Sequence, residues 1–261
     1  MINQPAFERS IHGDHQPSCL TVNNLTKKFN NESVLENLSM SIYQGEIHGI
    51  IGRNGVGKTT LIESIIGLKE IDAGTVNILG EDIKSSRYEI MEAVGIQPQE
   101  ANLLPRQSVS ETIHLFTSFY KESMDPKELM QMMELDQIES KRVKNLSVGQ
   151  KQRLLVALAM VGNPALIILD EPTTGIDPQI RQLIWRVLRS MKEKGCSILL
   201  STHYMDEAEK LCDRISILHD KKIIVHGSCH EIITEHREKF TDSLEDVFLH
   251  LTGTSLRREV D

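Results

Sequence analysis

The stretch GRNGVGKTT, residues 52–60, constrains the fold of this chain more than any other feature of its sequence. It follows directly after the apolar run Ile47 to Ile51, which is typical of a buried strand. Glycine weakens strands and helices alike, so three glycines in this place need a specific reason. A strand, a glycine-rich turn and a helix that begins near Lys58 form the basic unit of a parallel α/β sheet. The sequence therefore predicts an α/β fold.

The middle of the chain repeats this alternation of short β-rich runs and helical stretches. The run ALIIL, residues 165–169, is apolar without a break, which is typical of a parallel strand covered on both faces. We therefore predict a mostly parallel sheet. Its predicted strands are Glu46–Ile51, Ala165–Leu169, Ser197–Ser201, Arg214–Leu218 and Lys222–His226.

The clearest predicted helix is Gln179–Lys194, because its apolar residues recur at the spacing of one buried helix face. Asp177 is the candidate N-cap, Pro178 fits the first helical position, and Gly195 follows the last turn. Between about residues 98 and 163 the strand pattern stops, which indicates a mostly helical insertion. Its predicted helices are Ser108–Tyr120, Asp125–Leu135 and Ser147–Val161.

Composition and charge narrow the class of protein. The 261 residues suit one large domain or two small ones, and the net charge of −8 argues against an electrostatic nucleic-acid surface. The 4 cysteines form no CxxC pair, which favours reduced thiols. No apolar run approaches the ~20 residues that a membrane-spanning helix needs. The polar start, residues 1–18, lacks the apolar core of a secretory signal, and we expect it to be a flexible tail.

The glycine-rich loop fits the pattern G-x-x-x-x-G-K-[ST]. Gly52, Gly55 and Gly57 let the backbone turn tightly and bring its N–H groups close to phosphate oxygens, and the following helix adds the positive end of its dipole. Lys58 would neutralise the β- and γ-phosphates, and the Thr59 hydroxyl would bind Mg²⁺. A plain glycine-rich turn is the alternative, but the strand before it and the helix after it favour nucleotide binding.

A second candidate site is LIILDEP, residues 166–172, where an apolar strand ends in two adjacent carboxylates. Asp170, at the end of the strand, can hold Mg²⁺ directly or through water. Glu171 would then point near the γ-phosphate, where it could orient and deprotonate a water molecule. Taken alone, the two carboxylates could equally be acidic residues that begin a turn before Pro172. The glycine-rich loop upstream favours the catalytic interpretation.

A third candidate site is LSVGQKQR, residues 146–153. Ser147 and Gln150 form the S-x-x-Q pattern of a helix capping box. The same pattern places a hydroxyl, the Gly149 N–H and a helix N-terminus together, which makes a second anion site. Two phosphate sites for one nucleotide suggest that each is half of a shared site.

With these motifs in order, the chain resembles the ATP-binding cassette (ABC) ATPases from about Leu20 to His226. GRNGVGKTT looks like the Walker A loop of that family and LIILDEP like its Walker B strand. LSVGQ is similar to the family signature LSGGQ, with Val148 where glycine is usual. The resemblance implies an ATPase domain at residues 19–228. It would combine a mostly parallel sheet core with an antiparallel β subdomain and a helical subdomain at about residues 100–163.

The resemblance also implies roles for single residues. Phe29, in LTKKFNNESVL, matches the aromatic that stacks on adenine. Gln99, in GIQPQE, matches the glutamine that touches Mg²⁺ and water, with Gln97 as the less favoured candidate. His203, in LLSTH, matches the switch histidine that contacts the γ-phosphate. The implied catalytic residues are Glu171, His203 and Gln99, and the implied metal ligands are Thr59, Gln99 and Asp170. ATP would be held by Phe29, Gly52, Arg53, Asn54, Gly55, Val56, Gly57, Lys58, Thr59, Thr60, Ser147, Gly149 and Gln150.

In this family two cassettes hold two ATP molecules head to tail, and each site joins one Walker A loop to the signature helix of the other chain. The resemblance therefore implies a homodimer, or a heterodimer with a related ABC ATPase. The loop Gly175 to Asp177 would cross the interface. Val148 keeps its backbone N–H, so we expect the altered signature to be tolerated.

The segment SLEDVFLHLTG, residues 243–253, looks like the tail of ABC subunits of the drug-resistance, daunorubicin-exporter type. It has an apolar face made by Leu244, Val247, Phe248 and Leu251, within an expected helical extension at residues 229–261. This resemblance implies an ATPase at the cytoplasmic face of the cell membrane. It would power export of a drug, antibiotic or lipid-like substrate through separate transmembrane permease subunits.

Three alternatives stay open. The chain could be the ATPase of an ABC importer, because cassette sequences discriminate direction poorly. It could be a soluble ABC ATPase that acts on DNA or ribosomes, although one compact cassette and an acidic balance disfavour this and no nucleic-acid partner is expected. A regulatory module that binds nucleotide without hydrolysis is disfavoured by Glu171.

Overall fold

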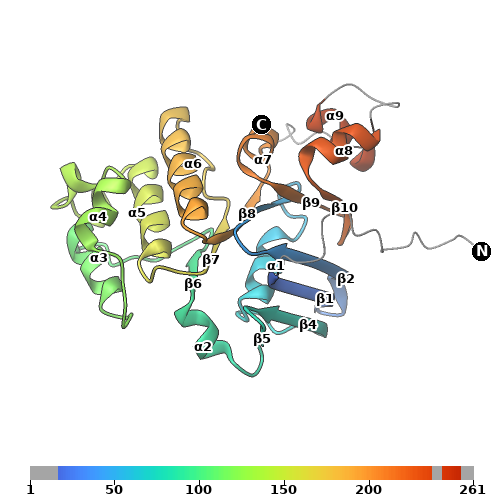
Figure 1. The fold of residues 1–261 in the computed structure, drawn as a ribbon, viewed down its shortest axis with the longest axis horizontal. Helices are drawn as coiled ribbons and strands as arrows, with labels where there is room; N and C mark the ends of the chain where they lie inside the picture. The colour runs from blue at the N-terminus through green and yellow to red at the C-terminus, as the bar shows by residue number, and fades with distance from the viewer. Residues whose placement is uncertain (1–16, 237–242, 254–261) are drawn as a thin grey trace, which may run out of the picture.

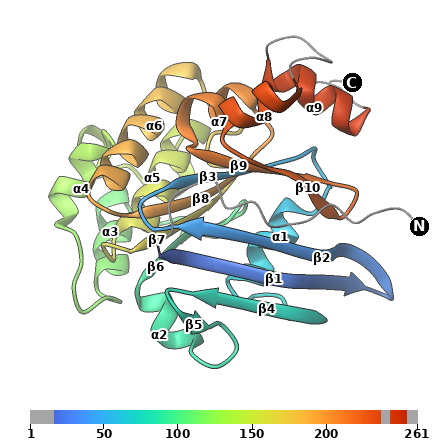
Figure 2. The same ribbon diagram turned by 45° about the vertical axis from the view of Figure 1, so that its right-hand side comes forward.

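The computed structural model describes residues 17–236 and 243–253. It is an α/β fold with two β-sheets (Figures 1 and 2). The predicted N-terminal tail lies outside the described residues up to position 16, whereas Ser18 already belongs to the first strand. None of the helices within the described ranges has the length and apolar character needed to cross a membrane.

The larger sheet has six strands in the order β10-β9-β3-β8-β7-β6. All its neighbours run parallel except β9 and β10, which pair antiparallel. The predicted strands are confirmed, with ends shifted by one residue at most, and β6 is an additional strand at the edge. The strands are β3 (Ile47–Ile51), β6 (Val94–Gln97), β7 (Leu166–Asp170), β8 (Ser197–Thr202), β9 (Arg214–His219) and β10 (Lys222–Gly227).

The smaller sheet is antiparallel and has the order β2-β1-β4-β5. It corresponds to the antiparallel subdomain that the family resemblance implies. Its two longest strands carry several register shifts, and Asn24 and Asn37 have positive φ angles within them. The strands are β1 (Ser18–Phe29), β2 (Glu32–Tyr43), β4 (Ala73–Ile78) and β5 (Glu81–Asp82).

Helices cover both faces of the larger sheet. On one face, α1 packs in a core that also contains the antiparallel sheet, and Leu166 and Ile168 of β7 point into this core. On the other face, α5 and α6 pack against Ile167 and Leu169 of the same strand. This alternation explains why the strand reads as one continuous apolar run. The helices outside the insertion are α1 (Lys58–Ile65), α2 (Arg87–Glu92), α6 (Pro178–Glu193), α7 (Met205–Leu211), α8 (Cys229–His236) and α9 (Leu244–Thr252).

The predicted helical insertion contains α3 (Val109–Thr117), α4 (Pro126–Met132) and α5 (Val148–Met160), which form the green and yellow lobe beside α6 in Figure 1. Each helix is shorter than predicted, because its first predicted residue is the N-cap and because it also ends before the predicted last residue. Ser108 and Ser147 both cap through capping boxes. Two short 3₁₀ turns lie between α4 and α5.

The two C-terminal helices pack on α7, close to the end of β8. Leu244, Val247 and Phe248 of α9 are buried, and Leu251 packs against the same cluster, which confirms the predicted apolar face. Glu209 of α7 accepts the backbone N–H of Leu244 at 3.1 Å. Contacts with α9 therefore stabilise α7, the helix that follows β8.

Candidate nucleotide site

The glycine-rich loop joins β3 to α1 and has backbone angles that favour glycine. Gly55 and Gly57 have φ angles of 77° and 111°, in the left-handed region. A Cβ on Gly52 would lie 2.8 Å from the Leu218 carbonyl oxygen. Gly57 is the N-cap of α1 and supplies no side-chain hydrogen bond, so the first N–H groups of α1 are left for a ligand.

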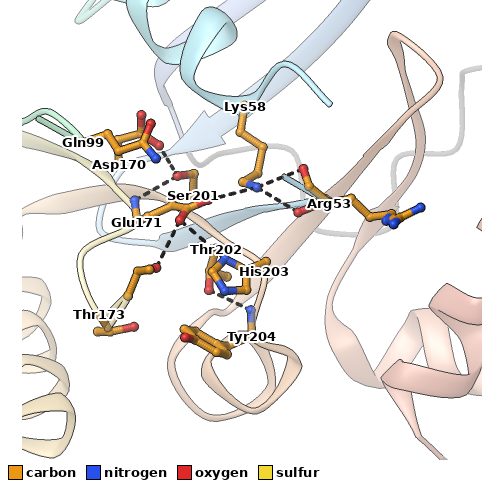
Figure 3. Close-up of polar contacts among 12 residues, drawn as sticks. Arg53, Lys58, Gln99, Asp170, Glu171, Thr173, Ser201, Thr202, His203 and Tyr204 are labelled. Atoms are coloured by element: carbon orange, nitrogen blue, oxygen red, sulfur yellow. Dashed lines mark hydrogen bonds and ion pairs between the residues drawn. The ribbon is translucent and has the colours of Figure 1, made fainter. Parts of the chain in front are cut away.

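Lys58 is buried at the start of α1, with 4% of its surface exposed. Its Nζ donates hydrogen bonds to the carbonyl oxygens of Gly52 at 2.8 Å and Arg53 at 3.2 Å. The same Nζ lies 3.1 Å from Glu171 Oε1 (Figure 3). The ammonium group is thus held inside the loop, while the Arg53 side chain extends away from it in the same view.

The two carboxylates lie where β7 ends, and β8 fixes their positions. Asp170 is the last residue of β7, and it pairs in register with Ser201 of β8. The Ser201 hydroxyl donates to Asp170 Oδ1 and accepts the Glu171 N–H at 3.0 Å. Glu171 has a φ of 51°, a conformation that costs a non-glycine residue free energy and occurs often at functional sites.

Glu171 lies between two basic groups. Its Oε2 is 3.4 Å from His203 Nδ1 and also accepts the Thr174 hydroxyl at 3.1 Å. Burial raises the pKa of Glu171, but His203 and Lys58 together outweigh burial and lower it to about 2. Glu171 is therefore ionised at neutral pH.

Asp170 has the opposite shift, because burial raises its pKa more than the Ser201 and Thr59 hydroxyls lower it. Thr59 also donates its hydroxyl proton to Gln99 Oε1 at 3.2 Å. The buried Gln97 instead donates to the carbonyl oxygens of Pro98 and Asp170, at 2.8 and 3.3 Å. Of the two glutamines, Gln99 is the one at Thr59.

A pocket of about 250 Å³ opens beside Lys58, Thr59, Gln99 and Glu171. It offers backbone N–H groups and an ammonium group for phosphate, and these residues fit that ligand. Thr59, Gln99 and Asp170 supply a hydroxyl, an amide oxygen and a carboxylate, which are the hard oxygen donors that Mg²⁺ prefers. The lining residues are Val34, Asn54, Gly55, Gly57, Lys58, Thr59, Thr60, Gln99 and Glu171.

The structure does not bring every predicted nucleotide residue to this pocket. Ser147, Gly149 and Gln150 lie at the N-terminus of α5, in the helical lobe, and none of them lines the pocket. Phe29, at the end of β1, is 41% exposed, and Lys27 and Lys69 place their Nζ atoms 5.1 and 5.2 Å from its ring centre.

Sequence reasoning missed two residues at this site. Ser201 links Asp170 to the Glu171 backbone, and Val34 lines the pocket from β2. The polar end of the apolar strand before His203 was a signal for Ser201, because the carboxyl ends of parallel strands meet at one edge of the sheet. Nothing in the local sequence signals Val34, whose place depends on the packing of β2.

Comparison with known proteins gives one family. A model of the ABC transporter family, ABC_tran, matches residues 35–174. The chain is 39% identical over 215 residues to a Nod factor export ATP-binding protein I of Burkholderia lata, covering 80% of this chain and 71% of that protein.

Two solved structures of ABC ATP-binding proteins are similar to this chain. The structure of an ATP-binding subunit of an ABC transporter matches with a TM-score of 0.82 and 29% identity, covering 90% of this chain and 99% of that one. A dimeric, post-hydrolysis ATP-binding cassette with bound ADP and Pi matches with a TM-score of 0.73 and 27% identity, covering 80% and 98%. The chain belongs to the ABC transporter family, and it is an ATP-binding subunit that hydrolyses ATP.

Proposed function

We propose that Glu171 orients and deprotonates the water that attacks the γ-phosphate of ATP. One observation carries this proposal: Glu171 is an ionised carboxylate held between Lys58 and His203, beside the mouth of the phosphate loop. The loop N–H groups and Lys58 would bind the phosphates. Because Lys58 is then drawn toward the phosphate oxygens, Glu171 becomes free to accept a hydrogen bond from water. His203 would stay beside the Glu171 carboxylate and contact the γ-phosphate.

Thr59, Gln99 and Asp170 are the proposed Mg²⁺ ligands. Mg²⁺, when bound with ATP, supplies positive charge that offsets the charge developing on the phosphate oxygens. The Thr59 hydroxyl and the Gln99 amide already contact each other, and burial disfavours an unpaired charge on Asp170. A divalent cation would remove that penalty by pairing with the carboxylate.

The proposed working unit is a dimer in which each ATP lies between the Walker A loop of one chain and Ser147, Gly149 and Gln150 of the other. The support is the separation of these residues from the pocket within one chain. Ser147 and Val148 are exposed at the start of α5, as a surface for a second chain requires. A homodimer is the simplest form, because each chain carries both halves of the site, and a related cassette is the other candidate partner.

The hydrolysis proposal is tested with Glu171→Gln, which removes the negative charge and keeps the side-chain shape. We expect ATP binding to be retained and phosphate release to fall by about 10²-fold or more, the usual effect of losing a general base. Phosphate release and nucleotide binding are measured on the same preparations. Glu128→Gln, on the exposed face of α4, is the matched control. Turnover at the control rate by Glu171→Gln would reject Glu171 as the base.

We further propose that the ATPase drives export through separate transmembrane permease subunits, at the cytoplasmic face of the membrane. The relative described above is named as an export ATP-binding protein, which supports export. The C-terminal segment that resembles exporters of the drug-resistance type forms α9, which packs on α7. The substrate contacts would lie mostly in the permease, and a drug, an antibiotic or a lipid-like molecule is the proposed substrate class.

The transport proposal is tested by affinity purification of tagged Glu171→Gln from detergent-solubilised membranes in the presence of Mg-ATP. We expect a polytopic membrane protein in near-stoichiometric amount. ATP-driven substrate flux in vesicles that contain both proteins then gives the direction of transport, and inward flux toward the ATPase would indicate an importer. Recovery with ribosomes or DNA only, and absence from membranes, would overturn the transport proposal.

A further inference from the structure

A buried carboxylate, Glu207 on α7, lies behind the proposed catalytic residues. Glu207 has 0% of its surface exposed. Its Oε1 accepts two hydrogen bonds, from the Thr173 hydroxyl at 2.8 Å and from Trp185 Nε1 at 2.7 Å. Thr173 and Trp185 are each 1% exposed. Among the residues that the structure describes, Glu207 takes part in no ion pair.

The three groups come from three different segments of the chain. Thr173 lies two residues after Glu171, in the turn that follows β7. Glu207 lies four residues after His203, in the first turn of α7. Trp185 belongs to α6 and donates its indole N–H to the same carboxylate oxygen. The bond from Thr173 to Glu207 therefore joins the two segments that carry Glu171 and His203.

The geometry of the site depends on how these two segments lie against each other. Glu171 Oε2 and His203 Nδ1 are 3.4 Å apart, and no covalent bond fixes this distance. Displacement of either segment by about 1 Å would separate them, and such misplacement can cost a catalytic site about 10²-fold in rate. A carboxylate buried with no cation in contact lowers stability unless its hydrogen bonds are satisfied. The position thus carries a cost in stability. One of its two short hydrogen bonds comes from Thr173, in the turn that carries Glu171, and the other comes from Trp185 of α6.

We infer that Glu207 is a positioning residue, which holds the Glu171 turn against the His203 segment through the hydroxyl of Thr173. Glu207 is fully buried and does not line the nucleotide pocket, so it would act on turnover through its contact with Thr173. This inference rests on the proposed roles of Glu171 and His203. Its consequence is a loss of turnover without a matching loss of ATP binding.

The test compares five variants of the full chain by steady-state phosphate release, nucleotide binding and thermal unfolding. Glu207→Ala removes the acceptor of both hydrogen bonds, and Thr173→Val removes only the hydroxyl bond. We expect each to lower kcat by about 10- to 100-fold and to change the Kd for ATP by less than about 3-fold. Because both break the same contact, the double variant should lose little more than either one alone.

Glu207→Gln is the rescue variant, because an amide oxygen accepts both hydrogen bonds. It should keep kcat within about 3-fold of the wild-type value, since the geometry is preserved while the charge is lost. Glu209→Ala is the control for general loosening of α7, because Glu209 lies on the same helix and caps α9 instead. It should leave kcat unchanged even where it lowers the unfolding temperature.

The pattern of kcat and ATP affinity across the variants decides the inference. The expected pattern of low kcat, unchanged ATP affinity, non-additivity and rescue by glutamine supports it. Wild-type kcat in Glu207→Ala or Thr173→Val overturns it, and so does an equal loss of kcat in Glu209→Ala. Glu171→Gln and His203→Ala are measured beside these variants. Wild-type turnover in those two would reject the proposed catalytic residues, whereas their inactivity with a fully active Glu207→Ala would reject only the positioning role.

Discussion

At the scale of single residues, the buried pair of Lys58 and Glu171 would connect nucleotide binding to the proposed hydrolysis. Their side chains are 4% and 8% exposed, and the Nζ to Oε1 distance is 3.1 Å. A buried charge that loses its partner is strongly destabilised, so each group needs the other while phosphate is not bound. ATP phosphates can replace Glu171 as the partner of Lys58. The same exchange leaves the carboxylate available to water.

Lys58→Ala tests this exchange at the binding step. Charged hydrogen bonds contribute about 1.5–3 kcal/mol each, so we expect ATP binding to weaken by about 10- to 100-fold or more. The remaining Glu171 charge would also repel the phosphates. Lys127→Ala, on the exposed surface of α4, is the control and should bind ATP normally. Titration with a fluorescent ATP analogue measures both, and wild-type affinity in Lys58→Ala would reject the phosphate-loop assignment.

Some contacts of the proposed catalytic site could be predicted from the sequence, and others could not. Lys58, Asp170 and Glu171 lie at strand ends within strongly patterned motifs, and their place in one edge of the sheet follows from parallel topology. The contact of Glu207 with Thr173 joins residues 34 positions apart in the chain. It depends on how α7 lies against the turn that follows β7, which no local pattern specifies. Tertiary contacts of this kind could be found only in the structure.

At the scale of elements, the helices were easier to predict than the antiparallel strands. Asp177, Ser108 and Ser147 all cap helices by accepting backbone N–H groups, and short polar side chains before an apolar run are a local signal for this. In β1 the period of two is broken by register shifts and by Asn24 at a φ of 50°. The strand is held by its pairing with β2 and β4, so its sequence alone carries a weak pattern.

The helical lobe joins the sheet through close packing of α5 on β6. A Cβ on Gly95 of β6 would lie 1.8 Å from the Ala159 carbonyl oxygen of α5. The obstacle is backbone, so no side-chain rotation relieves it. Glycine is therefore required here by the approach of the helix, at a position with an ordinary strand conformation.

Gly95→Ala should therefore lower the free energy of unfolding by about 3 kcal/mol or more, at the upper end of overpacking effects. Gly80→Ala is the control, because a Cβ there meets nothing within 4 Å while the φ is 89°. It should cost roughly 1–2 kcal/mol through backbone strain alone. Urea unfolding of both variants measures the difference. Equal losses would show that α5 does not rest on β6 as closely as described.

At the scale of the whole molecule, the residues proposed to hold ATP lie in two separate places on one chain. The pocket is lined by the loop between β3 and α1 together with Val34, Gln99 and Glu171, whereas Ser147, Gly149 and Gln150 lie on another lobe. The Ser147 capping box keeps the first turn of α5 formed. A second chain that brings this turn to the pocket would add an anion-binding helix N-terminus to the γ-phosphate.

The measurement that tests this account most directly is the mass of Glu171→Gln in solution, by size-exclusion chromatography with light scattering, with and without Mg-ATP. We expect a monomer without nucleotide and a dimer that retains two ATP molecules when Mg-ATP is present. Adding Ser147→Arg to the same chain should abolish the dimer while leaving ATP bound to each monomer. A monomer at saturating ATP, or a dimer that forms equally well with Ser147→Arg, would contradict a site shared between two copies of this chain.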